Sequence, residues 1–335
     1  MRIIIPMAGM GKRMRPHTLT VPKPLVPIAG KPIVQRLVED ITKVCNEKVE
    51  EIAFIIAPSF GAEVEKMLAG IAADLGAKGS IWYQEEALGT AHAILCAAPA
   101  LEGKVVVAFA DTLFKADFKM DTTREGIIWV QKIEDPRAFG VVKLDHSGNI
   151  TDFVEKPQTF VSDLAIIGIY YFNDGAYLRS ELQYLLDNDI RDKGEYQLTN
   201  ALENMKTKGT KFAPGKVTEW LDCGNKDATV YTNQRYLEFI SNSKDLKGDG
   251  VILENSTVIE PCYIGNGAHI VNSVIGPHVS VGAGTRIESS VISNSIIQAH
   301  TKIKDVRIVN SMVGNYAEIH GKAFDLSVGD YNIIK

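Results

Sequence analysis

Short apolar runs alternate with longer amphipathic stretches over about the first 240 residues. Apolar runs bounded by turn residues predict strands, and apolar residues at helical spacing predict helices. Residues 105–110 are apolar throughout, which is typical of a central strand covered on both faces. We expect Ser59 to cap the second helix. The predicted strands are residues 2–7, 52–57, 80–84, 105–110, 126–130 and 166–172, and the predicted helices include residues 32–44, 60–73, 90–98 and 226–240.

The pattern changes beyond a polar linker at residues 241–250. Aliphatic residues now recur at every fifth or sixth position, a period that fits neither a strand nor a helix. Such a repeat predicts a parallel β-helix of about four coils, each of about seventeen residues, and resembles the hexapeptide-repeat, left-handed β-helix family. The alternative, hairpins in a sandwich, requires a strict alternation that is absent here. The predicted inward residues are Leu253, Ile259, Ile264, Ile270, Ile275, Val281, Ile287, Ile292, Ile297, Ile303, Ile308, Val313 and Ile319.

This break in pattern predicts an α/β domain over residues 1–242 and a β-helix domain over residues 250–335. Basic residues total 36 and acidic residues 41, and a net charge of −5 argues against a nucleic-acid binder. No apolar run approaches the length of a membrane span or signal peptide. The four cysteines lack metal-like spacing, which favours reduced, mostly buried thiols. We therefore expect a soluble, cytoplasmic protein.

The first strand runs into a basic, glycine-containing loop. Between residues 1 and 38 there are seven Lys or Arg and no carboxylate, which points to an anionic ligand rather than to a merely solvated loop. Glycines after a strand let backbone N–H groups approach phosphate oxygens. A Walker loop is excluded because Arg13 follows Gly11-Lys12, and a dinucleotide fingerprint is excluded because Met14 replaces its third glycine.

Seven motifs, in order along residues 1–235, resemble the sugar-1-phosphate nucleotidylyltransferases. This family usually has Thr where the present chain has Lys12, which adds a charge to the loop. The motifs are Gly9-x-Gly11-x-Arg13-Met14-x-Pro16-x-Thr18 with Pro22-Lys23-Pro24-Leu25 and Gly30-Lys31-Pro32, Gln84 to Ala93, Phe109-Ala110-Asp111-Thr112, Phe139-Gly140 with Val154-Glu155-Lys156-Pro157, Ile167-Gly168-Ile169-Tyr170, Gly194-Glu195-Tyr196-Gln197-Leu198-Thr199, and Trp220-Leu221-Asp222-Cys223-Gly224.

The resemblance implies a Rossmann-like, three-layer nucleotidyltransferase domain with a mixed sheet, followed by the left-handed parallel β-helix. It also implies transfer of a nucleoside monophosphate from a nucleoside triphosphate to a sugar 1-phosphate, with release of pyrophosphate. The amide of Gln84 suits the paired edge of uracil or thymine, so dTTP or UTP is favoured, with glucose 1-phosphate as acceptor. The metal implied is Mg²⁺, which prefers carboxylate oxygens and substrate phosphates as ligands. A homo-oligomer is expected, because the coil ends and aliphatic flanks of a β-helix need covering.

By the same resemblance, each site residue has an expected role. Arg13, Lys23 and Asp111 are the catalytic candidates, and Asp111 and Asp222 are the metal ligands. The nucleotide-binding candidates are Ala8, Gly9, Gly11, Lys12, Arg13, Gln84, Gly89 and Thr90. The sugar-phosphate candidates are Gly140, Glu155, Lys156, Gly168 and Trp220.

Three other functions stay open at this point. Guanine presents an edge similar to that of uracil, so an enzyme like mannose-1-phosphate guanylyltransferase is one alternative. A bifunctional nucleotidylyltransferase and acyltransferase would need a base among His269, His278, His300 and His320, which we expect to be exposed turn residues. A non-catalytic regulator that binds nucleotide sugars is the third, against which the presence of Arg13, Lys23, Asp111 and Asp222 argues.

Overall fold

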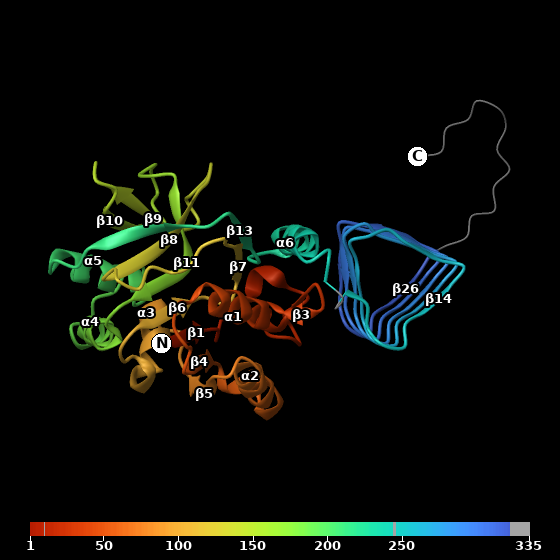
Figure 1. The fold of residues 1–335 in the computed structure, drawn as a ribbon, viewed down its shortest axis with the longest axis horizontal. Coiled ribbons are helices and arrows are strands. Elements are labelled where there is room, and N and C mark those ends of the chain that lie inside the picture. The colour runs from red at the N-terminus through yellow and green to blue at the C-terminus, as the bar shows by residue number, and fades with distance from the viewer. Residues whose placement is uncertain (10, 244–245, 322–335) are drawn as a thin grey trace. The chain divides into compact units, whose positions relative to one another are not determined.

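The computed structural model describes residues 1–9, 11–243 and 246–321, so residues 322–335 of the predicted second domain lie outside the described residues. The chain divides into two units (Figure 1). The first comprises Met1–Val26 and Lys31–Ala228, and the second comprises Pro27–Gly30 and the chain from Thr229 onward. The domain boundaries predicted at residues 242 and 250 stay a prediction.

A mixed nine-stranded sheet forms the centre of the first unit, as predicted. β1 (Arg2–Pro6) lies between β6 (Val105–Ala108) and β4 (Glu51–Ile56), parallel to both, and β5 (Lys78–Tyr83) extends this edge. β11 (Leu164–Phe172) runs antiparallel to β6. All four residues of β6 are buried, in agreement with a strand covered on both faces. The remaining strands of the sheet are β8 (Gly126–Lys132), β9 (Gly140–Leu144), β10 (Ile150–Glu155) and β12 (Phe212–Lys216).

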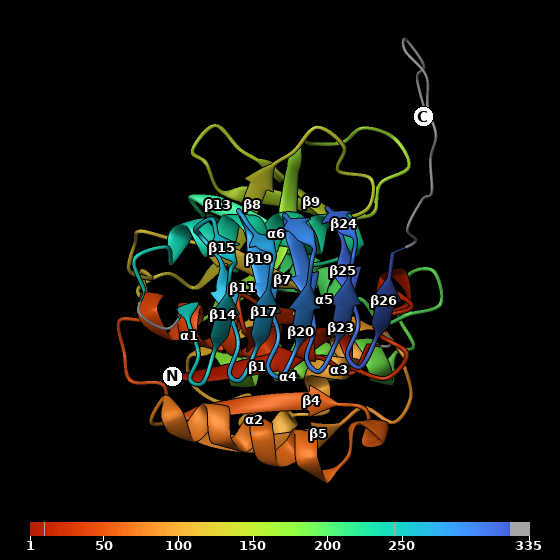
Figure 2. The same ribbon diagram turned by 90° about the vertical axis from the view of Figure 1, so that its right-hand side faces the viewer.

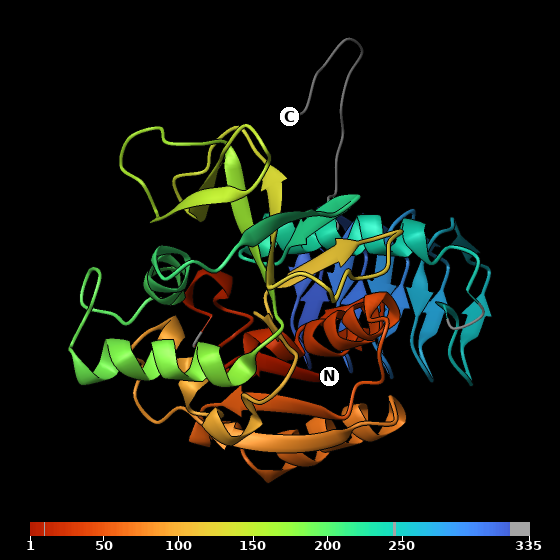
Figure 3. The same cartoon turned by 60° about the vertical axis from the view of Figure 1, so that its left-hand side comes forward.

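Helices cover both faces of this sheet and give the predicted three layers (Figures 1 and 3). The apolar core between sheet and helices takes alternate strand residues such as Ile4, Val105 and Val107, together with Leu178 and Leu202 from two of the helices. The intervening strand residues are also buried, because the opposite face is covered too. The helices of this unit are α1 (Ile33–Val44), α2 (Ala62–Asp74), α3 (Thr90–Leu95), α4 (Gly175–Asp187) and α5 (Leu198–Thr207), whereas α6 (Lys226–Phe239) begins at the end of the first unit and belongs mostly to the second.

Local chain geometry differs from the prediction at two helices. Ser59 lies in a short 3-10 turn (Pro58–Phe60) and does not cap α2, so that expectation is wrong. The N-cap position belongs to Gly61, and no side chain there accepts a helix N–H. The third helix ends at Leu95, and a 3-10 turn (Ala98–Ala100) containing Pro99 follows it. Proline lacks the N–H that an α-helix would need at that point.

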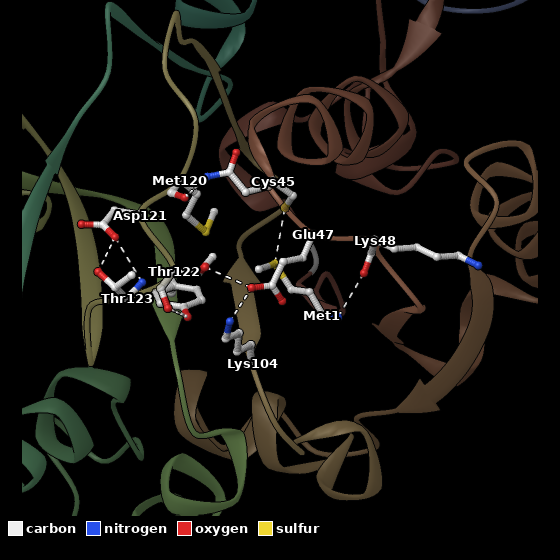
Figure 4. A network of polar contacts seen from close by, with 11 residues as sticks. Met1, Cys45, Glu47, Lys48, Lys104, Met120, Asp121, Thr122 and Thr123 are labelled. Atoms are coloured by element: carbon white, nitrogen blue, oxygen red, sulfur yellow. Dashed lines mark hydrogen bonds and ion pairs between the residues drawn. The ribbon is translucent and has the colours of Figure 1, made fainter.

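A polar cluster closes the amino-terminal edge of the central strands (Figure 4). The α-amino group of Met1 donates to the carbonyl of Lys48 at 3.1 Å. Glu47 pairs with Lys104, which directly precedes β6, and accepts a hydrogen bond from the Thr122 hydroxyl at 3.0 Å. Burial raises the pKa of Cys45 to about 11, so this thiol stays protonated. The expectation of reduced, mostly buried cysteines is met, because none of the four, all of which lie in the described ranges, forms a disulfide, and three are buried.

Residues 252–320 of the second unit form a stack of short parallel strands that fits the predicted left-handed β-helix (Figure 2). Equivalent residues of successive coils are 17 apart at first, as in Ile270 and Ile287, and later 16 apart, as in Ile287 and Ile303. These inward aliphatic residues form one continuous core. The three faces are β14 (Ile252–Glu254), β17 (His269–Val271), β20 (Arg286–Glu288), β23 (Lys302–Lys304) and β26 (Glu318–His320); β15 (Thr257–Val258), β18 (Val274–Ile275), β21 (Val291–Ser293) and β24 (Arg307–Val309); and β16 (Tyr263–Ile264), β19 (Val279–Val281), β22 (Ser295–Ile297) and β25 (Met312–Val313).

The first coil corrects the predicted register. Val258, not Ile259, is the partner of Ile275 and packs on the core, whereas Ile259 is 45% exposed. Leu253 is paired with Ile270 but is 38% exposed. It belongs to the first of the five strands on its face, so only one neighbouring coil stacks on it.

Asn233 of α6 links segments that are far apart in the sequence but belong to the second unit. Its side-chain oxygen accepts the backbone N–H of Ala29 at 3.0 Å and the Ser280 hydroxyl at 2.7 Å. Asn233 is fully buried, where paired polar groups are costly to disrupt. Within the described ranges, no helix combines the length and apolar character that crossing a bilayer requires.

Candidate active site

A cavity of about 530 Å³ opens in the first unit, where β1, β5 and β6 end. Carboxyl ends of parallel strands are the usual ligand sites of α/β sheets. All eight predicted nucleotide-binding residues line the cavity, together with Lys23 and Asp111. Its lining comprises Pro6, Met7, Ala8, Gly9, Gly11, Lys12, Arg13, Lys23, Pro24, Gln84, Ala87, Gly89, Thr90, Ala93, Phe109, Ala110, Asp111, Glu195 and Gly224.

The basic loop folds back over Lys23 at Gly11. Gly11 has a φ of +58°, and a Cβ there would lie 2.8 Å from the Cβ of Lys23, so both backbone conformation and space require glycine. The Thr18 hydroxyl donates to the Gly11 carbonyl at 2.8 Å and holds this turn. Lys12 and Arg13 follow in a short 3-10 turn (Lys12–Met14) on the cavity wall.

Lys23 is the buried cation of the site. Its side chain is only 9% exposed, and its ammonium donates to Asp111 Oδ2 at 2.9 Å. The carboxylate of Asp111 is 44% exposed and lines the cavity. The pair therefore presents an ammonium fixed by burial next to a carboxylate open to a ligand.

The two predicted metal ligands are neighbours because a backbone ladder holds them together. β7 (Thr112–Lys115) begins directly after Asp111, and β13 (Glu219–Asp222) pairs with it so that Asp222 lies opposite Thr112. The N–H of Cys223 also donates to the Asp111 carbonyl at 2.9 Å. Burial raises the pKa of Asp222, and the nearby charge of Asp111 raises it further.

Two like charges at such a site are relieved by a cation, which fits a divalent metal. In the described part of the chain, no group of three or more His, Cys, Asp or Glu side chains is arranged around a metal position. A metal at this place would take two protein carboxylates and complete its coordination with phosphate and water oxygens, as Mg²⁺ commonly does.

Gln84 and Gly89 line the cavity from the two ends of the connection between β5 and α3. Gln84 directly follows β5 and is 9% exposed, and its amide nitrogen lies 3.2 Å from the Gly89 carbonyl. Gly89 has a φ of +115°, and a Cβ there would lie 2.5 Å from the carbonyl oxygen of Tyr196. The Thr90 hydroxyl donates to Gln197 Oε1 at 3.2 Å and accepts the N–H of Leu198 at 2.9 Å.

The predicted sugar-phosphate residues do not line this cavity. Gly140 and Glu155 are paired across β9 and β10, and Lys156 contacts Glu155 at 3.2 Å. Gly168 lies within β11, where the register with β8 shifts, and its carbonyl accepts the N–H of Phe109 at 2.9 Å. The indole N–H of Trp220 donates to the Thr112 hydroxyl at 2.6 Å, beside the aspartate pair. Their sugar-binding role stays a prediction.

Several lining residues were not among the predicted site residues. Glu195 and Gly224 belong to motifs that the sequence displays, but no signal separates them from their neighbours. Phe109 and Ala110 end the apolar run that predicted a strand; that strand stops at Ala108, and the next two residues line the cavity. His92, which contacts Gln84 Nε2 through Nδ1 at 3.1 Å, was also missed.

The histidines of the β-helix differ in position. His278 and His300 have positive φ values and occupy turns, as predicted. His269 and His320 lie in strands β17 and β26, so the expectation of turn positions is wrong for them. His269 pairs with Glu254 at 3.1 Å, and His300 stacks on Tyr316 with ring centroids 5.0 Å apart.

Comparison with known proteins gives consistent matches along the chain. A family model described as nucleotidyl transferase matches residues 2–238. The low-salt glycan biosynthesis nucleotidyltransferase Agl11 of Haloferax volcanii is 30% identical over 354 residues, covering 97% of this chain and 95% of that protein. A glucose-1-phosphate thymidylyltransferase of Streptomyces antibioticus is 29% identical over 342 residues, covering 95% and 93%.

A solved structure also resembles this chain. It is a UDP-glucose pyrophosphorylase complexed with UDP-glucose, with a TM-score of 0.58 over 71% of this chain and 98% of that chain. The sequence identity is 23%, so this likeness is one of fold.

Proposed function

The chain belongs to the nucleotidyl transferase family, and on that premise we propose that it transfers a nucleoside monophosphate from a nucleoside triphosphate to a sugar 1-phosphate. The favoured substrates are dTTP or UTP and glucose 1-phosphate, and the products are an NDP-sugar and pyrophosphate. One observation carries the proposal: a basic glycine loop, a buried lysine paired with an open carboxylate, and a glutamine amide all line one cavity. These are groups suited to phosphates, to a transition-state charge and to a nucleobase.

In this reaction a phosphate oxygen of the sugar 1-phosphate attacks the α-phosphorus. The new O–P bond forms as the bond from the α-phosphorus to the bridging oxygen of pyrophosphate breaks. The nucleophile is already an anion near neutral pH, since its second pKa is about 6. The residues therefore need not remove a proton. Their task is to align two polyanions and to stabilise the charge that moves to pyrophosphate.

Lys23 is the group best placed for that charge. Its ammonium is buried and oriented by Asp111, so it reaches a developing charge without reorganisation. Lys12 and Arg13, on the loop, bind the triphosphate oxygens as charges and hydrogen-bond donors. Backbone N–H groups around Gly9 and Gly11 approach the phosphates where no side chain intervenes.

Asp111 and Asp222 are the proposed ligands of Mg²⁺. When bound, the ion neutralises phosphate charge and polarises the phosphoryl oxygens. The residues contribute two neighbouring carboxylates whose separation is set by the ladder between β7 and β13. Glu155 and Lys156 are proposed to bind the sugar hydroxyls and the sugar phosphate.

The decisive experiment is a matrix of five nucleoside triphosphates against several sugar 1-phosphates, with pyrophosphate release as the readout. We expect release only when both substrates and Mg²⁺ are present, with dTTP or UTP and glucose 1-phosphate among the best pairs. Hydrolysis of the triphosphate without a sugar phosphate, or no turnover with any pair, contradicts the proposal. The best pair being GTP with mannose 1-phosphate would replace the favoured substrates with the guanylyl alternative.

We further propose a homo-oligomer in the cytoplasm. The β15–β18–β21–β24 face of the β-helix supports self-association, because Val291 and Val309 are 46% and 44% exposed on it. By contrast, the β14–β26 face carries ion pairs such as Lys302 with Glu318. Analytical ultracentrifugation of Val291→Glu tests this: dissociation is expected, and an unchanged mass would contradict the assignment of the face.

A further inference from the structure

The Gln84 side chain uses both of its amide hydrogens inside the protein. Nε2 lies 3.2 Å from the carbonyl oxygen of Gly89 and 3.1 Å from Nδ1 of His92. A carbonyl oxygen only accepts, so the amide nitrogen and not the amide oxygen must face Gly89. Both N–H groups are then engaged, one on each partner.

The amide oxygen of Gln84 is left as the group that the side chain can offer to a ligand. No described residue donates a hydrogen bond to it, and Gln84 lines the cavity. The backbone N–H of Gln84 donates to Ile56 at 2.9 Å, which fixes the position of the residue at the end of β5. The cavity therefore meets a fixed acceptor at this point.

His92 must be neutral and protonated on Nε2 for this arrangement, because only an unprotonated Nδ1 can accept from the amide. His92 lies in α3, three residues after Gly89, the N-cap of that helix. Burial lowers the pKa of its imidazole, while the charge of Glu86 acts in the opposite sense. A neutral imidazole is the form expected near neutral pH.

We propose that His92 is a positioning residue for nucleobase selection: by accepting the second amide hydrogen of Gln84, it locks that amide as an acceptor toward the cavity. The inference rests on the proposed function, in which the cavity binds a nucleoside triphosphate. It extends that function by identifying the residues that recognise the nucleobase.

A locked acceptor discriminates by the ring nitrogen at the pairing edge of the base. Uracil and thymine present N3–H there, and guanine presents N1–H, so each can donate to Gln84 Oε1. Cytosine N3 and adenine N1 are acceptors, so their lone pairs would face those of Gln84 Oε1 and repel them. Because a buried polar group left unpaired costs free energy, the site would bind cytosine and adenine less well than uracil, thymine or guanine. Without His92, only the Gly89 carbonyl would hold the amide and its second N–H would lack an acceptor, so a rotated amide that offers N–H to cytosine would be less strongly disfavoured.

Two variants of His92 test this. His92→Leu removes the acceptor, whereas His92→Asn keeps an acceptor oxygen close to the position of Nδ1. We expect His92→Leu to lower the kcat/KM ratio of UTP over CTP by about tenfold or more, mainly through KM, as for the loss of one buried hydrogen bond. We expect His92→Asn to retain most of the ratio. An unchanged ratio in His92→Leu, or an equal loss in both variants, overturns the proposal.

A double-mutant cycle separates positioning from general structural support. In a Gln84→Ala background, the further change His92→Leu is expected to leave the UTP over CTP ratio unaltered, because no amide remains to be positioned. A further loss of discrimination in that background contradicts the proposal. If His92→Leu does not fold, nitrogen NMR of the wild-type protein decides, with His92→Asn to assign the signal. The Nε2–H tautomer is expected, and the Nδ1–H tautomer overturns the inference.

Calorimetric binding of UTP and CTP distinguishes this inference from the proposed function. Selective binding of UTP that depends on His92, without turnover, would sustain the inference and contradict the function. Turnover with a base preference that does not change in the His92 variants would support the proposed function and contradict the inference.

Discussion

The two units of this protein differ in how the sequence specifies their structure. In the β-helix, one inward aliphatic residue per strand, repeated every 16 or 17 residues on each face, is enough to form the core. In the α/β unit, the cavity is lined by residues spread along the sequence from Pro6 to Gly224, and these residues follow no repeat. A repeat distributes stability over many equivalent positions, whereas a site depends on single atoms. Substitutions should therefore reduce stability in the first region and turnover in the second.

The largest effect is expected at Asp111, where catalysis and metal binding meet. Asp111→Asn keeps the shape but removes the charge that pairs with Lys23 and that the metal would need. We expect kcat to fall by about a hundredfold to a thousandfold while the unfolding transition is retained. Asp117→Asn, an exposed aspartate just after β7, is the matched control. Retention of more than about a tenth of the activity, with the same Mg²⁺ dependence, would count against the role of Asp111.

Removal of the Lys23 ammonium should have the next largest effect. Lys23→Ala is expected to lower kcat by about a hundredfold, because a buried and oriented charge acts on the transition state. Lys12→Thr removes a loop charge and is expected to change mainly KM for the nucleotide. Lys31→Ala, at a position outside the cavity lining, controls for loss of a lysine in this region. The assignment is wrong if Lys12→Thr loses more turnover than Lys23→Ala.

In the β-helix the expected loss is one of stability. Ile287 is fully buried between Ile270 and Ile303, so Ile287→Ala should lower the free energy of unfolding by about 2–5 kcal/mol. The kcat of the folded protein should change little. Urea denaturation and steady-state kinetics on the same samples test both halves. A loss of kcat larger than that of Lys23→Ala would end the contrast between the two regions.

The smallest effect is expected on the exposed side of the same coil. The side chain of Arg286, the neighbour of Ile287, is 57% exposed and lies outside the proposed self-association face, so Arg286→Ala should change the free energy of unfolding by no more than about 1 kcal/mol. Urea denaturation of this variant and of Ile287→Ala gives the ratio of the two losses in free energy of unfolding. Equal losses in the two variants would mean that the inward and outward positions are misassigned.

The fold could be predicted largely from hydrophobic pattern, because each core residue obeys a local rule. Strands such as β6 are continuous apolar runs, and the period of the tail identified stacked coils. Errors arose where geometry overrides pattern. Ile259 matches the repeat but lies beside the inward Val258, and Ser59 is a good capping residue that lies within a 3-10 turn ahead of α2. Neither difference alters the spacing of apolar residues from which the elements were predicted.

The site could be predicted only in part. The family named from the motifs is confirmed, and the predicted nucleotide-binding residues line the cavity because most lie in two short contiguous segments. The relation between Asp111 and Asp222 depends on a ladder between strands about one hundred residues apart. His92 carries no signal at all until its ring is seen against Gln84. Contacts of that kind come from tertiary structure and have no local pattern.

The central claim is that the sugar phosphate attacks the α-phosphorus directly while both substrates occupy the site. A single in-line displacement inverts the configuration at phosphorus. The most direct measurement uses one diastereomer of an α-thio-substituted nucleoside triphosphate and determines the configuration of the NDP-sugar product by phosphorus NMR. The account predicts inversion. Retention would require two successive displacements through a nucleotidylated side chain, and would contradict it.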